Sequence, residues 1–350
     1  MNLENLQEDA VAERVPARAV RKSAHLGGAP ASLNSTSREI VAFKFGGSSL
    51  LGADRMLHAA SLVRTATQTS RVTVVVSAMK GVTDHLLAVA AHLTSGKFPQ
   101  ARREAEIVLD LHLDVLAGLA LSDENELRVC RGLQTLGRDL LHEVPPQASS
   151  LPRQVAGSAE LFDRLASFGE RFSARLFAAA LEKCGVPAVP VTSSDFVLTC
   201  DTFREAQPNF ESTRQRGREI LLPLLLDGIV PVVTGFIGAT PDGRITTLGR
   251  NSSDFTGAII AHVVAADELV IWTDVDGVYT ANPRETAEAK LLHEMSYEEA
   301  HALAASGAKV LHAKVLPLAA ETEMVVWVRN TFNPEARGTR IGPSQQGGAA

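Results

Sequence analysis

The sequence has little cysteine and no pattern that would use it. Its three cysteines, Cys130, Cys184 and Cys200, are odd in number, far apart and form no C-x-x-C pair. A disulfide framework or a structural zinc site needs more regularly spaced cysteines. The sequence therefore predicts neither, and a reducing cytoplasm is the expected location because thiols stay free there.

Long hydrophobic runs and an excess of basic charge are missing as well. The richest apolar stretch, 220–233, is interrupted by prolines, an aspartate and a glycine. It therefore falls short of the roughly 18 apolar residues that cross a bilayer. The net charge is −6, whereas binding to a phosphate backbone needs a concentrated basic surface. We expect no membrane-spanning segment and no nucleic-acid partner.

Several catalytic signatures are absent from the sequence. There is no G-x-x-x-x-G-K-[ST] loop, and no G-x-G-x-x-G follows the first predicted strand. Asp274-Val275-Asp276 begins like an EF-hand loop but departs from it at Val278 and Tyr279. A serine elbow, a His-x-x-x-His helix and the protein-kinase signatures are also missing. These absences argue against a P-loop ATPase, a dehydrogenase and a hydrolase.

What the chain does contain is the composition of a folded α/β protein. It is 45% hydrophobic and 21% charged, so it can bury a sizeable core. At about 150 residues per domain its length suggests two domains, or one large α/β domain. Residues 1–38 and 343–350 are rich in small and polar residues, and we expect both to be disordered tails. A partner-binding role for the first tail is the less favoured alternative.

Hydrophobic patterning predicts strands that alternate with helices. The β-branched run at 72–76 is typical of a strand that is buried on both faces of a parallel sheet. The expected strands are 40–45, 72–76, 188–191, 229–236, 269–272 and, as the last one, 324–328. The expected helices are 54–68, a segment ending at 92, one or two within 101–142, 159–184, 213–226, 255–266 and one begun by a capping box at Ser296. This alternation predicts a mostly parallel central sheet with helices on both faces.

The most informative stretch is 248–254, together with the strand and turn that follow it. Arg250 offers a planar fork that suits a carboxylate or a phosphate, and Asp254 lies near a helix start, where backbone N–H groups favour anions. The turn 273–279 follows a strand, and ligands of open α/β sheets bind at such carboxyl ends. A small zwitterion and a nucleotide fit these residues. A capped helix and an ordinary Asp-Gly turn fit them equally well.

Lys44 lies near the end of the first predicted strand, just ahead of Gly46 and Gly47. A lysine there can place a mobile charge on a transferring phosphoryl group, while glycine N–H groups hold its oxygens. Taken alone, the pattern is weak, and a surface lysine beside a turn is the simpler interpretation.

Five segments, in this order, resemble the aspartate kinases of the amino-acid-kinase family. They are KFGGSS (44–49), FGERFSA (168–174), TLGRNSSD (247–254), WTDVDGVYTANPR (272–284) and GAKVLH (307–312). The resemblance covers about residues 40–342, and the ordered set is far more specific than any one segment.

The resemblance implies an αβα sandwich that transfers a phosphoryl group from ATP to the side-chain carboxylate of L-aspartate, with Mg²⁺ held mainly by the phosphates. Residues 39–342 would form the catalytic domain, with a substrate side at about 39–235 and a nucleotide side at about 236–342. Position by position, it assigns catalysis to Lys44, Gly46, Gly47 and Asp254. It assigns substrate binding to Ser77, Thr83, Glu170, Arg250 and Asp254. It assigns nucleotide binding to Lys44, Gly47, Thr273, Asp274, Tyr279, Arg284 and Lys309. It implies no protein-bound metal.

This assignment agrees with the chemistry. The β-carboxylate of aspartate is already ionised at pH 7, so the reaction needs no general base. Catalysis becomes positioning and the neutralisation of charge between two anions. Lysines and glycine amides, which the chain supplies, suit that task.

The sequence also departs from the family pattern. Ala313 and Lys314 follow GAKVLH where the family commonly has Pro and then Arg or Ala, and Met79-Lys80 is a variation in the second loop. Typical members continue into paired ACT domains, whereas this sequence stops near Ile341. We therefore expect no intrinsic feedback inhibition. A homodimer is expected, and a separate ACT-containing partner chain stays open.

Three functional interpretations follow. The favoured one is an aspartate kinase at the first step toward lysine, threonine and methionine. The second is a related kinase that acts on a different amino-acid carboxylate in a dedicated pathway. The third is a catalytically silent regulatory subunit.

Overall fold

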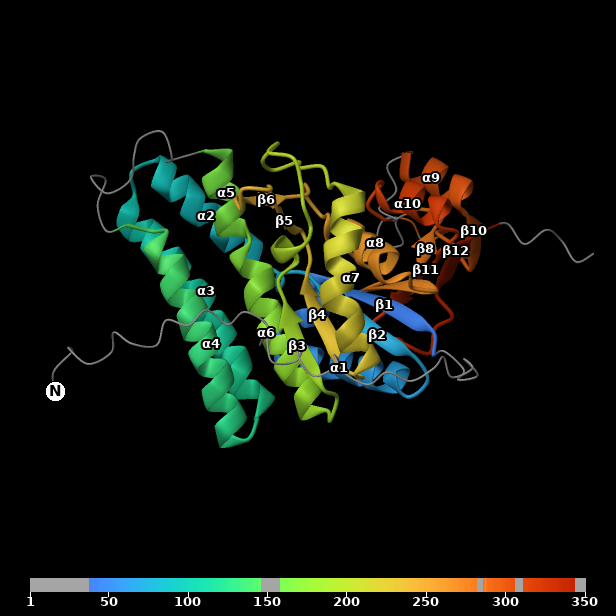
Figure 1. Ribbon diagram of the computed structural model, residues 1–350, viewed down its shortest axis with the longest axis horizontal. Coiled ribbons are helices and arrows are strands. Elements are labelled where there is room, and N and C mark those ends of the chain that lie inside the picture. Colours follow the sequence, from blue (N-terminus) through green and yellow to red (C-terminus); the bar gives the residue numbers. More distant parts are fainter. Residues whose placement is uncertain (1–37, 146–157, 282–285, 287, 306–310, 344–350) are drawn as a thin grey trace, which may run out of the picture. The chain divides into compact units, whose positions relative to one another are not determined.

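The computed structural model describes residues 38–145, 158–281, 286, 288–305 and 311–343. Their central feature is an eight-stranded sheet in the order β10-β12-β11-β7-β1-β2-β4-β3 (Figure 1). Six neighbouring strands of this sheet, β11, β7, β1, β2, β4 and β3, are parallel to one another. Strand β12 is antiparallel to β11 and parallel to β10. The strands are β1 (Ile40–Phe45), β2 (Arg71–Val76), β3 (Ala188–Val191), β4 (Val230–Thr234), β7 (Glu268–Thr273), β10 (Glu294–Ser296), β11 (Val325–Asn330) and β12 (Thr339–Gly342).

Two short antiparallel ladders and a set of helices complete the described part. The ladders pair β5 (Ile237–Ala239) with β6 (Ile245–Thr247), and β8 (Val278–Tyr279) with β9 (Leu291–Leu292). The helices are α1 (Ala53–Thr67), α2 (Val82–Thr94), α3 (Phe98–Leu119), α4 (Asp123–His142), α5 (Ala159–Ala166), α6 (Phe168–Lys183), α7 (Phe210–Leu226), α8 (Ser253–Val264), α9 (Tyr297–Ala305) and α10 (Val315–Glu321), with single turns η1 (Gly47–Leu50) and η3 (Ser193–Asp195).

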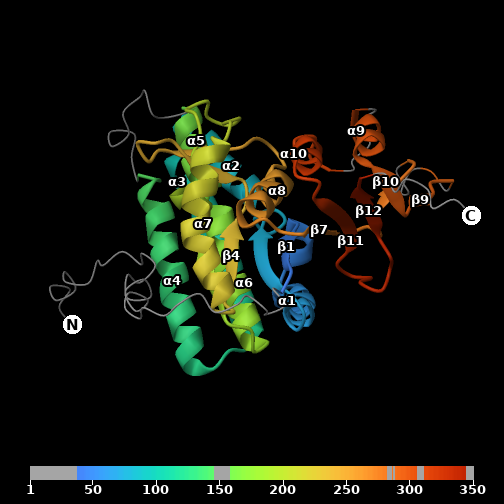
Figure 2. The same ribbon diagram turned by 45° about the vertical axis from the view of Figure 1, so that its right-hand side comes forward.

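Helices cover both faces of the sheet, so the protein has two hydrophobic cores. Alternate residues of a strand face opposite sides. Val41, Phe43 and Phe45 of β1 pack into a core shared with α1 to α6, whereas Ala42 packs into a core shared with α7, α8 and α10. Figures 1 and 2 show α3 and α4 as a long hairpin beside α6, far from α9 and α10. The predicted fold class, an αβα sandwich around a mostly parallel sheet, is confirmed.

Most predicted elements are present, and the capping box is confirmed in detail. Ser296 Oγ accepts a hydrogen bond from Glu299 N (3.1 Å), while Glu299 Oε2 accepts one from Ser296 N (2.8 Å). Segment 98–142 forms two helices. The residue after α3, Ala120, has a left-handed backbone conformation (φ 48°) that ends the helix, and α4 begins after Ser122.

Several predicted elements differ from the structure. The helix predicted at 159–184 is divided at Ser167 into α5 and α6, and the helix predicted at 213–226 begins three residues earlier, at Phe210. The strand at 324–328 is not the last one, because β12 follows and pairs with β11. Its four residues, TRIG, carry too little hydrophobic signal to be recognised as a strand. The helix predicted at 255–266 begins two residues earlier, at Ser253, so Asp254 lies in its first turn.

Some predictions cannot be compared with the fold. The tails at 1–38 and 343–350 lie outside the described residues except for Arg38 and Pro343. The division into two sides at about residue 235 stays a prediction, although both segments contribute strands to one sheet. Among the described helices, none combines the length and the apolar composition that crossing a bilayer requires.

A buried histidine in α3 makes the fold sensitive to acid. His112 has no exposed surface and stacks on Phe172 with ring centroids 4.5 Å apart. Its Nδ1–H donates to the Val108 carbonyl (2.6 Å), while Nε2 has no hydrogen-bond partner. Desolvation by burial lowers the pKa of His112 to about 4, against the opposing effect of the Val108 hydrogen bond. The folded protein therefore holds this ring neutral.

We predict that His112→Leu reduces the loss of stability on acidification. The unfolded chain binds a proton at His112 below its ordinary pKa of 6.5, whereas the folded chain does so only below about 4. Stability is thus lost as the pH falls from 6.5 to 4, by about 3 kcal/mol from this group. Urea unfolding at several pH values measures the slope. A constant packing cost of the substitution leaves that slope unchanged, so equal slopes in the variant and wild type would contradict the prediction.

Candidate active site

The carboxyl ends of three neighbouring strands are joined by backbone hydrogen bonds. Ser77 N, after β2, donates to the Phe45 carbonyl of β1 (3.2 Å), and Gly235 N, after β4, donates to the Val76 carbonyl (2.9 Å). Lys80 N then donates to the Gly47 carbonyl (3.1 Å). The loops that follow β1, β2 and β4 therefore meet at one edge of the sheet, where open α/β sheets bind ligands.

A cavity of about 530 Å³ opens at this edge. Its lining includes residues from all three loops, from α5 and α6, and from the start of α8. Eight of the predicted site residues share it: Lys44, Gly46, Gly47, Ser77, Thr83, Glu170, Arg250 and Asp254. The structure thus brings together side chains that lie as far apart in the sequence as Lys44 and Asp254.

Lys44 and Asp254, which both line the cavity, form an ion pair that is largely shielded from solvent. Lys44 Nζ lies 2.7 Å from Asp254 Oδ1, and Lys44 is only 8% exposed. The pair forms because Asp254 lies in the first turn of α8, where a carboxylate also interacts favourably with the helix dipole. Gly257 allows the approach of α8 to β1, since a Cβ there would lie 3.3 Å from the Lys44 Cβ.

Glu170 is a buried carboxyl group with one unsatisfied oxygen. It is 4% exposed, and its Oε1 accepts a hydrogen bond from Ala78 N (3.0 Å), while Oε2 has no partner. Gly169 lets α6 approach the 77–81 loop, because a Cβ there would lie 2.7 Å from the Ala78 Cβ. Desolvation raises the pKa of Glu170 to about 8, although the Ala78 hydrogen bond and the charge of Lys44 oppose the shift. Such an oxygen is ready to accept a hydrogen bond from a ligand.

Arg250 is held at the rim of the cavity by an unusual turn. The residues on either side of it, Gly249 (φ 103°) and Asn251 (φ 59°), have left-handed backbone conformations. Within the described part of the chain, no carboxylate forms an ion pair with Arg250. Its guanidinium is therefore available to an anionic ligand.

A second buried carboxylate, Asp163 of α5, forms hydrogen bonds with Thr247 of β6, which precedes Arg250 by three residues. Asp163 Oδ2 accepts hydrogen bonds from Thr247 N and Arg204 N (both 2.8 Å), and Oδ1 accepts one from Thr247 Oγ1 (2.8 Å). Desolvation raises the pKa of Asp163, whereas these three hydrogen bonds lower it. The carboxylate ties α5 to β6 across more than eighty residues of sequence, which fixes one wall of the cavity.

Of the predicted nucleotide residues, Lys44 and Gly47 line the cavity, and the other five lie at the end of β7 or later in the chain. Thr273 ends β7, and Gly46 N donates to the neighbouring Trp272 carbonyl (3.3 Å). The cavity lining does not include Thr273, Asp274 or Tyr279. Burial, and then the charge of Asp276, raise the pKa of Tyr279. Arg284 and Lys309 lie outside the described residues.

The turn after β7 is well braced. Asp276 Oδ1 accepts hydrogen bonds from Asn330 Nδ2 (2.7 Å) and Asn333 Nδ2 (3.1 Å). Gly277 has φ 154°, and a Cβ there would lie 2.5 Å from Thr339 Oγ1, so this position requires glycine. These contacts brace the part of the turn that contains Asp276 and Gly277.

Several residues that line the cavity were not predicted. They include Lys80, Asp84, Phe162, Phe236 and Asn251. Phe162 follows the helical spacing of α5, which does not distinguish a cavity wall from ordinary core. The sequence did contain a feature that could have drawn attention to Lys80, because Met79-Lys80 departs from the family pattern.

The described residues contain no group of three or more His, Cys, Asp or Glu side chains that could hold a metal ion. The donor set of the cavity suits organic anions and an ammonium group instead. That Mg²⁺ is held through phosphates remains a prediction.

Comparisons with known proteins identify the family to which the chain is similar. The model of the amino acid kinase family matches residues 39–330. The chain is 34% identical over 303 residues to lysine-sensitive aspartokinase 3 of Escherichia coli K12, and 33% identical over 304 residues to the chloroplastic aspartokinase 1 of Arabidopsis thaliana. These matches cover 87% and 85% of this chain but 64% and 51% of the relatives.

A solved structure shows the same arrangement. The crystal structure of E. coli aspartokinase III in complex with aspartate and ADP matches with a TM-score of 0.77 at 32% identity. The match covers 87% of this chain and 64% of that chain. The chain therefore spans less than two thirds of the length of these relatives.

We predict that Gly47→Ala destabilises the protein and that Gly46→Ala does not. A Cβ at Gly47 would lie 2.5 Å from the Ala78 carbonyl oxygen, so the two loops must separate, whereas a Cβ at Gly46 would make contacts no shorter than 3.6 Å. We expect Gly47→Ala to lower the free energy of unfolding by about 1–3 kcal/mol. Denaturant unfolding of both variants measures this. Equal effects at the two positions would show that the loops are not packed as described.

Proposed function

Because this chain belongs to the amino acid kinase family, we propose that it transfers the terminal phosphoryl group of ATP to the side-chain carboxylate of L-aspartate. The observation that carries this proposal is the shared cavity, where a buried lysine, an unpaired arginine and a buried carboxyl group meet beside a glycine turn. The aspartokinases among the relatives support it. So does the aspartate and ADP complex of the E. coli enzyme, whose fold matches.

One end of the cavity suits the α-amino acid group of aspartate. Arg250 would hold the α-carboxylate with two parallel hydrogen bonds. The ammonium group would donate to Glu170 Oε2, which lacks a partner, and to Asp254. Ser77 and Thr83 line the same cavity and would supply further polar contacts. These groups select an amino acid but leave the length of its side chain open.

The other end suits a phosphoryl group. Lys44 is fixed by Asp254, so its ammonium is positioned before any ligand arrives. The N–H groups of the Gly46-Gly47 turn would hold phosphate oxygens. Mg²⁺ bound to the phosphates would neutralise part of their charge. Because the attacking carboxylate is ionised at pH 7, the chain needs no proton acceptor there.

The nucleotide would lie on the side of β7. Thr273, Asp274 and Tyr279 occupy the braced turn next to Gly46. Together with Arg284 and Lys309, these residues are proposed as its contacts. The aspartate pathway, control by feedback, a dimer and a cytoplasmic location stay predictions.

The test is turnover with Mg-ATP and L-aspartate. We expect ADP release, and acyl phosphate trapped as the hydroxamate, with activity reduced by at least about 10²-fold in Lys44→Ala. Lys97→Ala, at an exposed lysine just before α3, is the matched control and should keep full activity. Absence of turnover with aspartate, but turnover with another amino-acid carboxylate, would favour the related kinase. ATP binding without any turnover would favour a silent subunit.

We predict that binding of L-aspartate at pH 7 releases about one proton from Glu170. The unliganded carboxyl group, with its pKa raised to about 8, is mostly protonated at pH 7. It must ionise to pair with the ammonium group, so affinity rises as the pH increases from 7 to 9. Calorimetry in buffers of different ionisation enthalpy counts the proton.

A neighbouring carboxylate provides the control for this measurement. Glu170→Gln should abolish proton release, whereas Asp84→Asn, at an exposed acid that lines the same cavity, should retain it. A binding enthalpy that does not depend on the buffer in the wild type would rule out this role of Glu170.

A further inference from the structure

The proposed reaction brings several negative charges together at the transferring group. ATP and the side-chain carboxylate are both anions. Lys44 is already paired with Asp254, and Arg250 would be occupied by the α-carboxylate. The cavity lining also includes the acid Asp84. A further cation that is not committed to a protein carboxylate would therefore speed the approach of the two substrates.

Lys80 is such a cation, and its backbone lies against the glycine turn. Lys80 N donates to the Gly47 carbonyl (3.1 Å), and the Lys80 Cα lies 3.4 Å from the position of a Cβ on Gly47. The residue lines the cavity together with Lys44 and Arg250. The absence of a side chain at Gly47 is what allows the Lys80 backbone to come this close.

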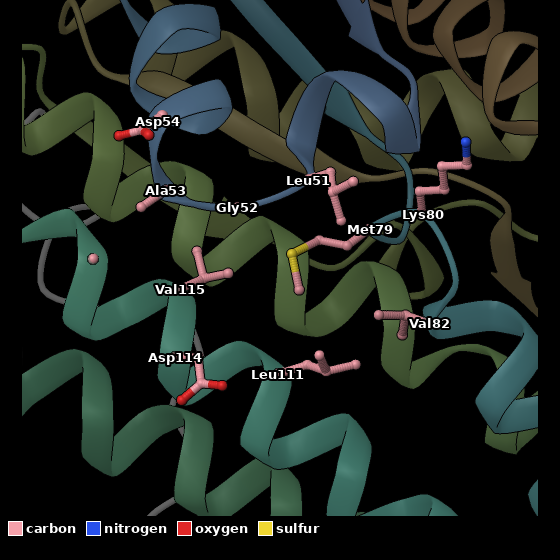
Figure 3. A pocket seen from close by; sticks show the side chains of 11 residues that line it. Leu51, Gly52, Ala53, Asp54, Met79, Lys80, Val82, Leu111, Asp114 and Val115 are labelled. Carbon is pink, nitrogen blue, oxygen red and sulfur yellow. The ribbon is translucent and has the colours of Figure 1, made fainter.

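The charged end of Lys80 is free to reach a ligand. Its side chain is exposed, and among the described residues no carboxylate lies within ion-pair distance of it. Lys80 also lines a second cavity of about 440 Å³, together with apolar side chains such as Met79, Leu111 and Val115 and the acids Asp54 and Asp114. Figure 3 shows the Lys80 ammonium pointing away from Leu111 and Asp114 of that second cavity. The buried Met79 anchors the loop, while the next residue extends its charge outward.

We propose that Lys80 binds the terminal phosphate of ATP and stabilises it during transfer. This inference rests on the proposed function and adds a catalytic residue to it. The aspartate carboxylate oxygen forms the new bond to phosphorus, the bond to the bridging oxygen breaks, and its electron pair leaves with ADP. Lys80 acts through its charge and forms no covalent bond. A lysine suits this task because its ammonium is a compact charge on a flexible stem.

The terminal phosphate distinguishes ATP from ADP, so binding of the two nucleotides tests the contact directly. In Lys80→Met we expect the Kd of Mg-ATP to rise about tenfold, while that of Mg-ADP changes less than about twofold. Methionine keeps an apolar stem, so the unfolding midpoint should stay at the wild-type value. Lys80→Arg should bind ATP nearly as well as the wild type. Lys97→Met is the matched control and should change neither Kd.

Steady-state kinetics give the second readout. Lys80→Met should lower kcat/KM for ATP about tenfold to a hundredfold, with the KM for aspartate within about twofold of the wild type. Lys80→Arg should recover most of this loss. A purely structural role would shift the unfolding midpoint and would not separate ATP from ADP.

Each outcome decides between the two proposals. Wild-type turnover that persists unchanged in Lys80→Met overturns the role of Lys80 and leaves the kinase intact. Selective loss of ATP binding in Lys80→Met, without wild-type turnover on aspartate, overturns the proposed function but keeps the phosphate contact. Equal changes in ATP and ADP affinity overturn the contact. A wild-type protein that binds neither nucleotide overturns both.

Discussion

The ion pair between Lys44 and Asp254 is the interaction on which the site depends. It joins the end of β1 to the start of α8, and both residues line the cavity. Burying either charge alone is costly, so each residue fixes the other in place. The pair also sets the electrostatics of the site, because it positions a lysine while cancelling much of its charge. The further cations, Arg250 and Lys80, remain unpaired within the described residues and can respond to a ligand.

Three glycines allow the elements around this ion pair to pack closely together. Gly257 admits α8 to β1, Gly169 admits α6 to the loop after β2, and Gly47 admits that loop to the turn after β1. At Gly47 and Gly169 a Cβ would lie within 2.7 Å of a neighbouring atom. The glycines of the motifs thus act partly as packing residues. Their effect on ligand binding follows from how closely they let the loops approach one another.

Much of this arrangement could be predicted from sequence, because hydrophobic periodicity and strand-end motifs are local signals. The strands around Lys44, the capping box at Ser296 and the grouping of motif residues at strand ends needed no tertiary information. Features set by long-range contacts could not be predicted. Strand β12 is too short and polar to be recognised without its partner strand β11. The sequence gives Asp163 no feature that distinguishes it from other helix residues, because its role comes from its hydrogen bond with Thr247 of β6. Phe162 becomes a cavity wall only through the same contact.

Asp163 does not line the cavity, but it holds segments that do. Its carboxylate accepts hydrogen bonds from the backbone N–H groups of Arg204 and Thr247 and from the Thr247 hydroxyl, so these three donors are satisfied. Thr247, which it holds, lies three residues before Arg250, and Arg204 packs over the Phe162 ring at 4.3 Å. The position of the Arg250 turn and the wall formed by α5 are therefore fixed by one buried group. Because burying a carboxylate is costly unless its oxygens are hydrogen-bonded, loss of any one of these donors destabilises the arrangement. The Arg250 side of the cavity thus depends on the polar contacts of Asp163, whereas the Lys44 side depends on the ion pair with Asp254.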